Sequence, residues 1–322
     1  MKETIGYPTA LSYYSYYPFW NAFFTTLGFS VVISPASSKQ IIDWGVKETV
    51  NDACIPIKLF HGHVMSLKDR VDYLFVPRMV SVDGKTTFCP KFLGLPDMVR
   101  WSIPDLPRLI DERIDLKKGA RGLLSTCYKI GNFLKQNPAR VFYAYLVAQW
   151  VHRQYQDNLN RGIFPNKILP SKETGRGLNS IETEIRIAVL GYPYEIYDSY
   201  ISVNLLQKLN EMGVAVRTVE MLSNKVLGGY RHRLSKNLFW QYSNRVLWAT
   251  YHYLEKKIDG IIHVSAFGCG PDAMLDKLMQ LEAKKHDIPF MTLTLDEHTG
   301  EAGVVTRLEA FVDMVRFRRE SS

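Results

Sequence analysis

Two stretches of the chain share one pattern of hydrophobic and polar positions. Residues 4–34, TIGYPTALSYYSYYPFWNAFFTTLGFSVVIS, match residues 189–219, VLGYPYEIYDSYISVNLLQKLNEMGVAVRTV. In both stretches two glycines stand 22 positions apart, beginning at Gly6 and at Gly191. Each stretch is typical of a strand, a Gly-Tyr-Pro turn, an aromatic loop, an amphipathic helix closed by glycine, and a second strand. The repeat therefore predicts two related halves.

A short apolar run follows later in each half. VDYLFVP begins 65 residues after Gly6, and IDGIIHVS begins 67 residues after Gly191. Such runs suit buried parallel strands, and strands that alternate with helices predict a parallel sheet covered on both faces. We therefore expect an α/β protein made of two doubly wound parallel-sheet (Rossmann-like) domains.

The expected domains are an N-terminal α/β domain (residues 1–115), a helical connecting segment with a linker (116–183) and a C-terminal α/β domain (184–322). PNKILPSKETGRGLNS, residues 165–180, is polar and contains the glycines and serines typical of linkers. The last strand is expected at IPFMTLTLD, followed by the loop EHTGEAG and the helix VVTRLEAFVDMVRF. In open α/β sheets a ligand lies outside the carboxyl ends of the strands, so we expect the site there.

Three of the four cysteines share one setting. Cys54, Cys89 and Cys269 each stand one or two residues before a proline, whereas Cys127 does not. Proline is favoured in the first turn of a helix, and the apolar spacing beyond Cys54 and Cys269 predicts a helix after each. A helix N-terminus lowers the pKa of a thiol and favours the thiolate that binds metal. Cysteines from two domains would meet only at the cleft between them.

Gly268 and Gly270 flank Cys269. We expect these cofactor-binding positions to leave room for a bulky group and to direct amides toward its sulfurs. The residues alone leave three interpretations open: a metal cluster, buried structural thiols, or a zinc site or catalytic thiol. Three thiolates without a fourth would leave one iron of a cubane open to an outside ligand.

Composition and charge narrow the class of protein. With 46% hydrophobic residues the chain has the composition of a folded globular protein. The start, MKETIGYPTA, lacks the apolar core of a signal peptide, and no long uncharged apolar stretch follows. We expect a cytoplasmic protein without a membrane partner. The net charge of +8 is spread along the chain without a recognition motif, so no nucleic-acid partner is expected.

Six motifs together resemble the acyl-CoA dehydratase activase-related family, which is also described as a CoA-enzyme activase domain of uncharacterised function. They are GYPTALSYYSYYPFW, ACIPIKLFHGHV, CPKFLGLPD, GYPYEIYD, FGCGPD and LDEHTGEAGVVTRLEAF. The family is similar to the iron–sulfur subunits of 2-hydroxyacyl-CoA dehydratases and benzoyl-CoA reductases, and to double-cubane-cluster proteins. The resemblance implies a cysteine-held cluster and an ATP-hydrolysing activator protein that delivers low-potential electrons. The chain itself has no GxxxxGK[ST] loop for ATP.

The resemblance implies Cys54, Cys89 and Cys269 as cluster ligands and leaves out Cys127. One [4Fe-4S] cluster per chain is favoured over a double-cubane [8Fe-9S] cluster, which needs about twice as many thiolates. A cluster shared across a homodimer is the alternative.

The loop after the last expected strand offers acid–base groups. Glu297, His298 and Glu301 are candidate catalytic residues. The alternative is a capped loop in which Thr299 or Glu301 closes the N-terminus of the next helix.

Other polar and aromatic residues favour structural roles. His61 and His63 lie on different faces of one expected helix, so structural hydrogen bonds are favoured over a role beside Cys54. The aromatic run YYSYYPFW favours packing over stacking on a ligand. Arg78, Lys91 and Arg307 are candidates for binding the phosphate of CoA or an anionic substrate.

The first hypothesis is an oxygen-sensitive iron–sulfur redox protein that uses electrons from the activator for reductive or radical chemistry on an acyl-CoA or another small molecule. The second is a non-catalytic electron-relay or assembly subunit that binds a larger subunit. The third is a cluster-free two-domain binding protein in which the cysteines are structural.

Overall fold

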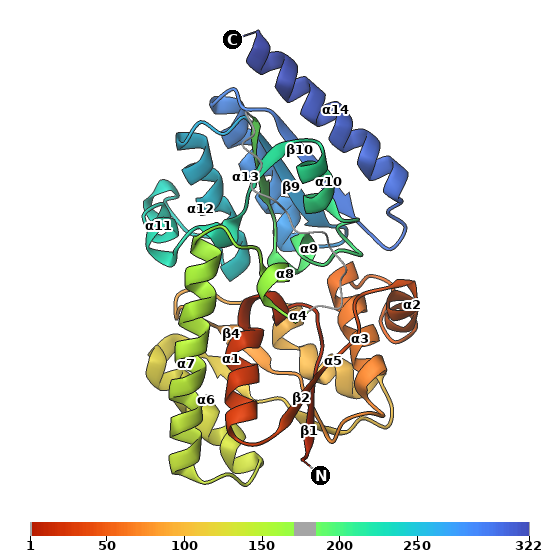
Figure 1. The fold of residues 1–322 in the computed structure, drawn as a ribbon, viewed down its shortest axis with the longest axis vertical. Coiled ribbons are helices and arrows are strands. Elements are labelled where there is room, and N and C mark those ends of the chain that lie inside the picture. The colour runs from red at the N-terminus through yellow and green to blue at the C-terminus, as the bar shows by residue number, and fades with distance from the viewer. Residues whose placement is uncertain (1, 171–184, 322) are drawn as a thin grey trace. The chain divides into compact units, whose positions relative to one another are not determined.

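The computed structural model describes residues 2–170 and 185–321, and their contacts divide the chain into two compact units. Unit 1 is Met1–Asp157 with Leu238–Gln241, and unit 2 is Asn158–Asn237 with Tyr242–Ser322. Each unit combines parallel strands with helices (Figure 1), so the expected α/β class is confirmed. Residues 171–183 of the predicted linker lie outside the described residues.

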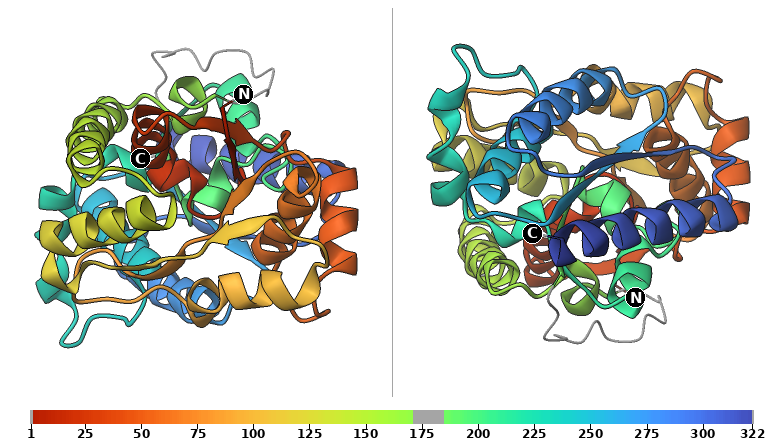
Figure 2. Two further views of the ribbon diagram at one scale, coloured as in Figure 1. Left: turned by 90° about the horizontal axis from the view of Figure 1, so that it is seen from below. Right: turned by 90° about the horizontal axis from the view of Figure 1, so that it is seen from above.

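Unit 1 is built on a four-stranded parallel sheet with the order β2-β1-β3-β5. Two further strands, β4 and β6, form a separate two-stranded parallel sheet. In the chain, β4 follows β3 and β6 follows β5. The strands of unit 1 are β1 (Thr4–Tyr7), β2 (Ser30–Ile33), β3 (Tyr73–Phe75), β4 (Arg78–Ser81), β5 (Arg108–Ile110) and β6 (Arg113–Asp115). Its α-helices are α1 (Tyr13–Thr26), α2 (Lys39–Lys47), α3 (Ile55–Leu67), α4 (Pro90–Leu93), α5 (Leu95–Ser102), α6 (Ala120–Phe133) and α7 (Pro138–Asn160). Helices lie on either side of these strands (Figure 2, left).

Unit 2 has a four-stranded parallel sheet with the order β10-β9-β7-β8. Its strands are β7 (Ile185–Leu190), β8 (Val214–Arg217), β9 (Gly260–Ala266) and β10 (Phe290–Leu295). Its α-helices are α8 (Pro165–Ile168), α9 (Pro193–Ile196), α10 (Leu205–Glu211), α11 (Asn224–Gly228), α12 (Gln241–Glu255), α13 (Gly270–Lys285) and α14 (Glu301–Glu320). Helices α13 and α14 lie on opposite sides of the strands (Figure 2, right). The predicted last strand and closing helix are confirmed.

The two sheets have the same topology. In each, the first strand of the half is central and pairs with the second strand on one side and the third on the other. An aspartate caps the start of each central strand: Asp72 accepts a hydrogen bond from the amide of Thr4, and Asp259 accepts one from the amide of Arg186, both at 2.7 Å. The repeat in the sequence therefore corresponds to a repeat in the structure.

Some segments differ from the prediction. The aromatic run expected as a loop lies in α1, where Tyr13, Tyr17 and Trp20 are buried at helical spacing. The ring of Trp20 packs on the sheet residue Phe75, and the rings of Tyr13 and Tyr17 pack on Tyr7 of β1. The expected packing role is thus confirmed, but the expected loop is wrong, because the rings repeat with the period of a helix. Helices α6 and α7, which the sequence placed in a connecting segment, group with unit 1.

Helices α2 and α3 touch backbone to backbone. A Cβ atom on Gly62 of α3 would clash with the carbonyl oxygen of Ile41, and one on Gly45 of α2 would clash with the carbonyl oxygen of Lys58. The two glycines therefore allow the helices to approach more closely than side chains would permit. This contact fixes α3, the helix that begins directly after Cys54.

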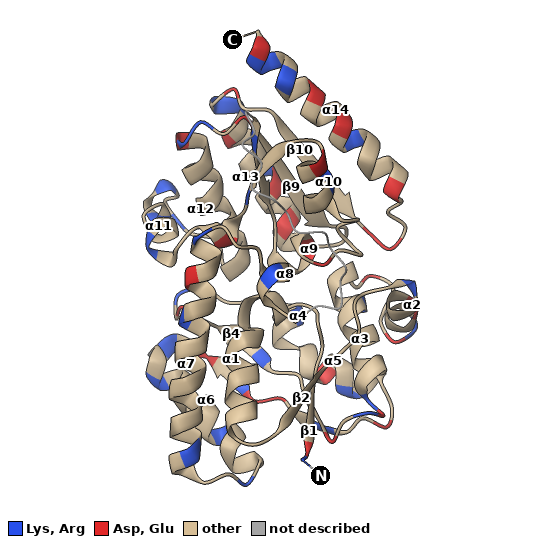
Figure 3. Ribbon diagram, viewed as in Figure 1, with Lys and Arg blue, Asp and Glu red and all other residues tan. Residues whose placement is uncertain are grey.

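Lys and Arg are distributed over many elements, and acidic residues alternate with them along α14 (Figure 3). Among the described residues, every helix is too short or too polar to span a bilayer.

We predict that Gly62→Ala destabilises the protein by about 3 kcal/mol or more, because the added methyl group meets backbone that cannot rotate away. The midpoint of urea unfolding of the full chain measures this loss. Gly303→Ala is the control: its Cβ would meet no atom within 4 Å, so the alanine should keep or slightly raise stability. Equal stability of Gly62→Ala and the wild type would contradict the close contact.

Candidate functional site

Cys54 and Cys89 occupy the same kind of position in unit 1. Each is the N-cap of a helix, with extended backbone angles (φ −66°, ψ 153° and φ −63°, ψ 157°), and each is followed by proline in the first turn. The N-cap is the position where Ser, Thr, Asp or Asn normally accepts a hydrogen bond from the helix amides. Neither thiol makes such a capping bond. The helix predicted after Cys54 is confirmed, and a short helix follows Cys89 as well.

The structure brings Cys54 and Cys89 close enough to influence each other's charge. Burial is the main effect on Cys54 and raises the pKa of its thiol, and repulsion from Cys89 adds to the rise. The ammonium group of Lys91 and the amides of Ile57 and Cys54 act in the opposite direction, favouring the thiolate. The expectation of a lowered pKa is therefore wrong for Cys54, because burial outweighs the helix terminus.

The segment before Cys89 is held by a distant part of the chain. The amide of Thr87 donates to the carbonyl of Phe239 at 2.9 Å, and the amide of Gln241 donates to the carbonyl of Thr87 at 2.8 Å. These bonds form an isolated parallel bridge between Thr87 and Trp240. The segment Leu238–Gln241 thus belongs to unit 1 and lies next to the chain before Cys89. The sequence alone did not predict this contact.

Arg78 fixes the other end of the helix that follows Cys89. Its guanidinium donates to the carbonyl of Leu93, the last residue of α4, at 2.6 Å and to both carboxylate oxygens of Asp97 at 2.8 and 2.9 Å. The guanidinium group therefore already binds protein atoms, which argues against the predicted role of Arg78 in binding phosphate. Lys91 donates to the carbonyl of Asp52 at 3.3 Å, and so lies near the chain that leads to Cys54.

Cys269 takes the equivalent position in unit 2. It is the N-cap of α13, with φ −88° and ψ 100°, and Pro271 stands in the first turn. Gly268 adopts φ +77°, a left-handed conformation that glycine accepts without strain. A Cβ on Gly270 would meet no atom within 4 Å. The helix predicted after Cys269 is confirmed, and the space expected beside Gly270 is present.

Cys269 follows the carboxyl end of β9, next to the central strand β7. This is the point where the strand order reverses, the usual place of a ligand in such sheets. Tyr192, which follows β7, is buried here, and its hydroxyl lies 2.7 Å from the hydroxyl of Ser243. Burial raises the pKa of Tyr192 far above its usual value, and the nearby Asp272 and Cys269 raise it further. Tyr192 is therefore a neutral phenol beside Cys269.

The three predicted cysteine ligands are all partly exposed, two in unit 1 and one in unit 2. Cys127 is buried on α6, and its burial raises the pKa of its thiol. Within the described ranges, no three His, Cys, Asp or Glu side chains are grouped as a metal site.

The loop after β10 is well capped. Asp296 accepts hydrogen bonds from the amide of His298 at 2.8 Å and from the hydroxyl of Thr299 at 3.0 Å. Glu301 begins α14 and pairs with Lys208 at 2.6 Å, which lowers the pKa of its carboxyl group. His298 is exposed and Glu297 is partly exposed. Asp296 thus closes the loop, but α14 begins after Gly300 without a side-chain capping bond. The expected closure of its N-terminus by Thr299 or Glu301 is therefore wrong, and the catalytic roles stay predictions.

His61 and His63 make structural hydrogen bonds, as the sequence favoured. Nδ1 of His61 lies 2.9 Å from the carbonyl oxygen of Ile57. Nε2 of His63 lies 2.9 Å from the hydroxyl of Ser37. Burial lowers the pKa of both, that of His63 to about 3, so both imidazoles are neutral at pH 7.

The sequence did not reveal a buried charged triad in unit 2. His263, in the middle of β9, is fully buried between two carboxylates of α13: its Nε2 lies 3.1 Å from Asp272 and its Nδ1 lies 2.8 Å from Asp276. Burial opposes the charged imidazole, but the charges and hydrogen bonds of Asp272 and Asp276 outweigh it and raise its pKa to about 9. The Asp-Ala-Met-Leu-Asp spacing after Cys269 puts both acids on one helix face, a signal that could have suggested the triad.

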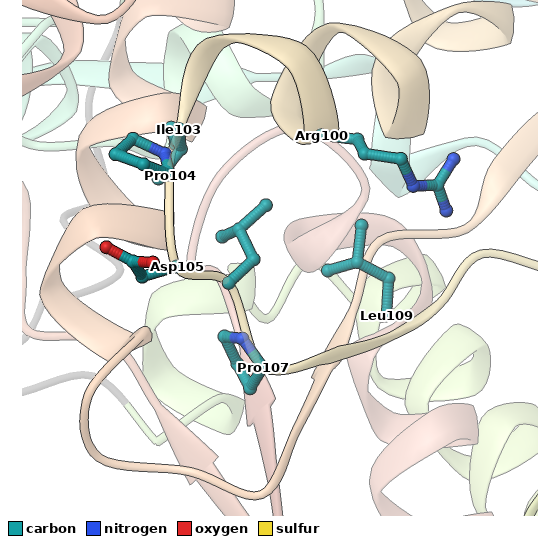
Figure 4. Close-up of a pocket in the computed structure, with 7 residues that line it drawn as sticks. Arg100, Ile103, Pro104, Asp105, Pro107 and Leu109 are labelled. Carbon is teal, nitrogen blue, oxygen red and sulfur yellow. The ribbon is translucent and has the colours of Figure 1, made fainter.

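A separate cavity of about 330 Å³ lies in unit 1 (Figure 4). It is lined by Arg100, by the loop 103–107 that leads into β5, and by Leu109 of that strand. It therefore stands at the amino end of a sheet strand, and it contains none of the predicted site residues.

We predict that the free energy of unfolding falls by roughly 3 kcal/mol as pH rises from 6.5 past 9, because of His263. Its folded-state pKa of about 9 lies above the ordinary 6.5. The stabilisation is therefore complete below pH 6.5 and is lost as pH rises through about 9. Urea unfolding at a series of pH values measures it. In His263→Gln this part of the pH dependence should vanish, and an unchanged pH profile in the variant would refute the assignment.

Comparison with known families places the chain in one of them. No curated protein matches the chain. The family model described as the CoA enzyme activase uncharacterised domain matches residues 4–222, a range that includes the central strands of both sheets, Cys54 and Cys89. The resemblance noted from the motifs is thereby confirmed, and the chain belongs to the CoA enzyme activase uncharacterised domain family.

Proposed function

We propose that the chain is an iron–sulfur redox protein in which Cys54, Cys89 and Cys269 ligate one [4Fe-4S] cluster, with ligands from both units. The observation that carries this proposal is the shared position of the three thiols. Each is a partly exposed helix N-cap that makes no capping bond and is followed by proline. An N-cap cysteine contributes little to its helix, whereas helix amides stabilise a metal-bound thiolate.

The residues present fit such a group. Cys54 and Cys89 lie near each other and near the cation Lys91, which offsets the negative charge of thiolates. Gly270 leaves open space beside Cys269. Cys127 is fully buried on α6 and is not part of the proposed ligand set.

A [4Fe-4S] cluster held in this way supplies one-electron reduction at low potential. We propose that the electrons come from an ATP-hydrolysing activator protein, and that the chain acts on an acyl-CoA or another small molecule as an oxygen-sensitive component in the cytoplasm. Glu297, His298 and Glu301 are proposed to move protons or to position the substrate. The shared strand order supports two doubly wound Rossmann-like domains, in each of which a ligand would lie at the carboxyl ends of the strands.

A second candidate function is electron relay or assembly, as a homodimer or with a larger subunit. The capped loop at Asp296 and the pairing of Glu301 with Lys208 favour it, since they give these residues structural roles. Turnover separates the two: conversion of an acyl-CoA by the reduced protein with its activator supports an enzyme, and a stable complex without turnover supports a relay.

We predict that Cys54→Ser, Cys89→Ser and Cys269→Ser each lower the iron and sulfide content after anaerobic reconstitution by at least half, because each removes a thiolate ligand. Chemical iron and sulfide analysis with the visible absorption spectrum measures the loss. Cys127→Ala is the matched control and should keep the full content. A colourless wild type, or Cys54→Ser with full iron, would favour the cluster-free binding protein instead.

A second prediction concerns the space beside Cys269. Gly270→Val should keep the free energy of unfolding of the metal-free protein within about 1 kcal/mol of the wild type, because a Cβ atom at this position would meet no atom within 4 Å. The variant should nevertheless bind less iron, because the new side chain occupies space intended for the cluster. Iron content equal to that of the wild type would show that the space serves another purpose.

A further inference from the structure

The triad of His263, Asp272 and Asp276 carries net negative charge inside unit 2. Asp272 and His263 are fully buried, and the side chain of Asp276 is 19% exposed. The hydroxyl of Thr292 on β10 donates to Asp276 at 2.6 Å. The imidazole holds its proton at neutral pH because its pKa lies near 9. Two carboxylates therefore share one cation, which leaves one net negative charge.

Asp272 places this charge next to the candidate site. It stands three residues after Cys269, in the first turn of the helix that Cys269 caps. Asp272 and Cys269 both raise the pKa of Tyr192, so both are close to the same phenol. Oδ1 of Asp272 meets His263, while its buried Oδ2 has no hydrogen-bond partner. A buried carboxylate oxygen without a partner is costly, which calls for an explanation other than stability.

The repeat shows that the fold does not require these charges. The strand pairing aligns His263 beside Leu190 with Tyr73 beside Ile5 in unit 1. The third residue after Cys89 is the buried Phe92, where unit 2 has Asp272. Unit 1 therefore has aromatic residues at these two sequence positions, and the ring of Tyr73 packs against Phe29 and Phe133. Replacing a buried ion pair by apolar groups is often neutral or stabilising, so the triad has a role beyond packing.

We propose that the triad lowers the reduction potential of the redox group held by Cys269, an inference that rests on the proposed function. The step is the transfer of one electron from the activator to that group, with no bond made or broken. A fixed negative charge nearby disfavours the added electron, because charge and hydrogen bonding set the potential of such centres. In a buried setting the charge is only weakly screened. Asp272 is the residue that delivers the effect, since it is the closer of the two carboxylates in sequence to Cys269.

The test compares two variants that each remove one carboxylate from His263. Reconstituted full-length Asp272→Asn and Asp276→Asn are titrated with redox mediators under anaerobic conditions, and their iron content and unfolding midpoints are measured alongside. Asp272→Asn should shift the reduction equilibrium about tenfold toward the reduced form, which is 59 mV for one electron. Asp276→Asn should shift the reduction potential by less than half as many millivolts as Asp272→Asn. A purely structural triad predicts equal effects of the two variants.

Each outcome decides between the proposals. A shift in Asp272→Asn that clearly exceeds that in Asp276→Asn supports the inference. If the wild type binds iron and Asp272→Asn has the same reduction potential as the wild type, the inference is overturned and the proposed function stands. The same conclusion follows if both variants change the potential equally. A wild type that binds no iron after reconstitution overturns the proposed function and the inference with it.

Discussion

The geometry of the helix N-cap governs the candidate site. At this position the backbone is extended, the side chain stands at the end of the helix, and the first amides have no partner within the helix. Cys54, Cys89 and Cys269 all occupy it, each with proline in the turn that follows. A serine or aspartate there would cap the helix. None of the three thiols makes such a cap, and this shared geometry is the basis of the proposed ligand set.

The helices that carry these thiols are fixed by different contacts. The glycines of α2 and α3 let two backbones touch and so hold the helix after Cys54. Arg78 holds the far end of α4 by a bidentate pair with Asp97, and Leu238–Gln241 supports the chain before Cys89. In unit 2 the helix after Cys269 is tied to its sheet by His263. The two halves thus share a topology but differ in how they support the site, with apolar and backbone contacts in one and buried charge in the other.

Part of this organisation could be predicted from the sequence. The matching Gly-Tyr-Pro stretches predict two related sheets, and proline after cysteine predicts the N-caps at Cys54 and Cys269, because these signals are local. The aromatic run predicts a loop because nearly every residue around Pro18 is aromatic, so no polar face marks a helix. In the structure Pro18 lies inside α1. The thiol pKa of Cys54 depends on burial, which spacing does not reveal.

Contacts between residues that are far apart in the sequence could not be predicted from it. The imidazole of His263 sits in an apolar strand, and its acids come nine and 13 residues later. They meet it only because α13 folds back over β9 and β10. The bonds between Thr87 and the segment Leu238–Gln241 span about 150 residues. Lys208 likewise finds Glu301 only in the folded protein. Apart from the spacing of four residues between Asp272 and Asp276, the sequence contains no local signal for these contacts.

The measurement that tests the central claim most directly is the native mass spectrum of the anaerobically reconstituted chain. The account predicts one added mass of four irons and four sulfides per chain, lost together when the three N-cap cysteines are replaced by serine. A spectrum with no added mass, or with single metal ions that persist in the triple variant, would contradict it.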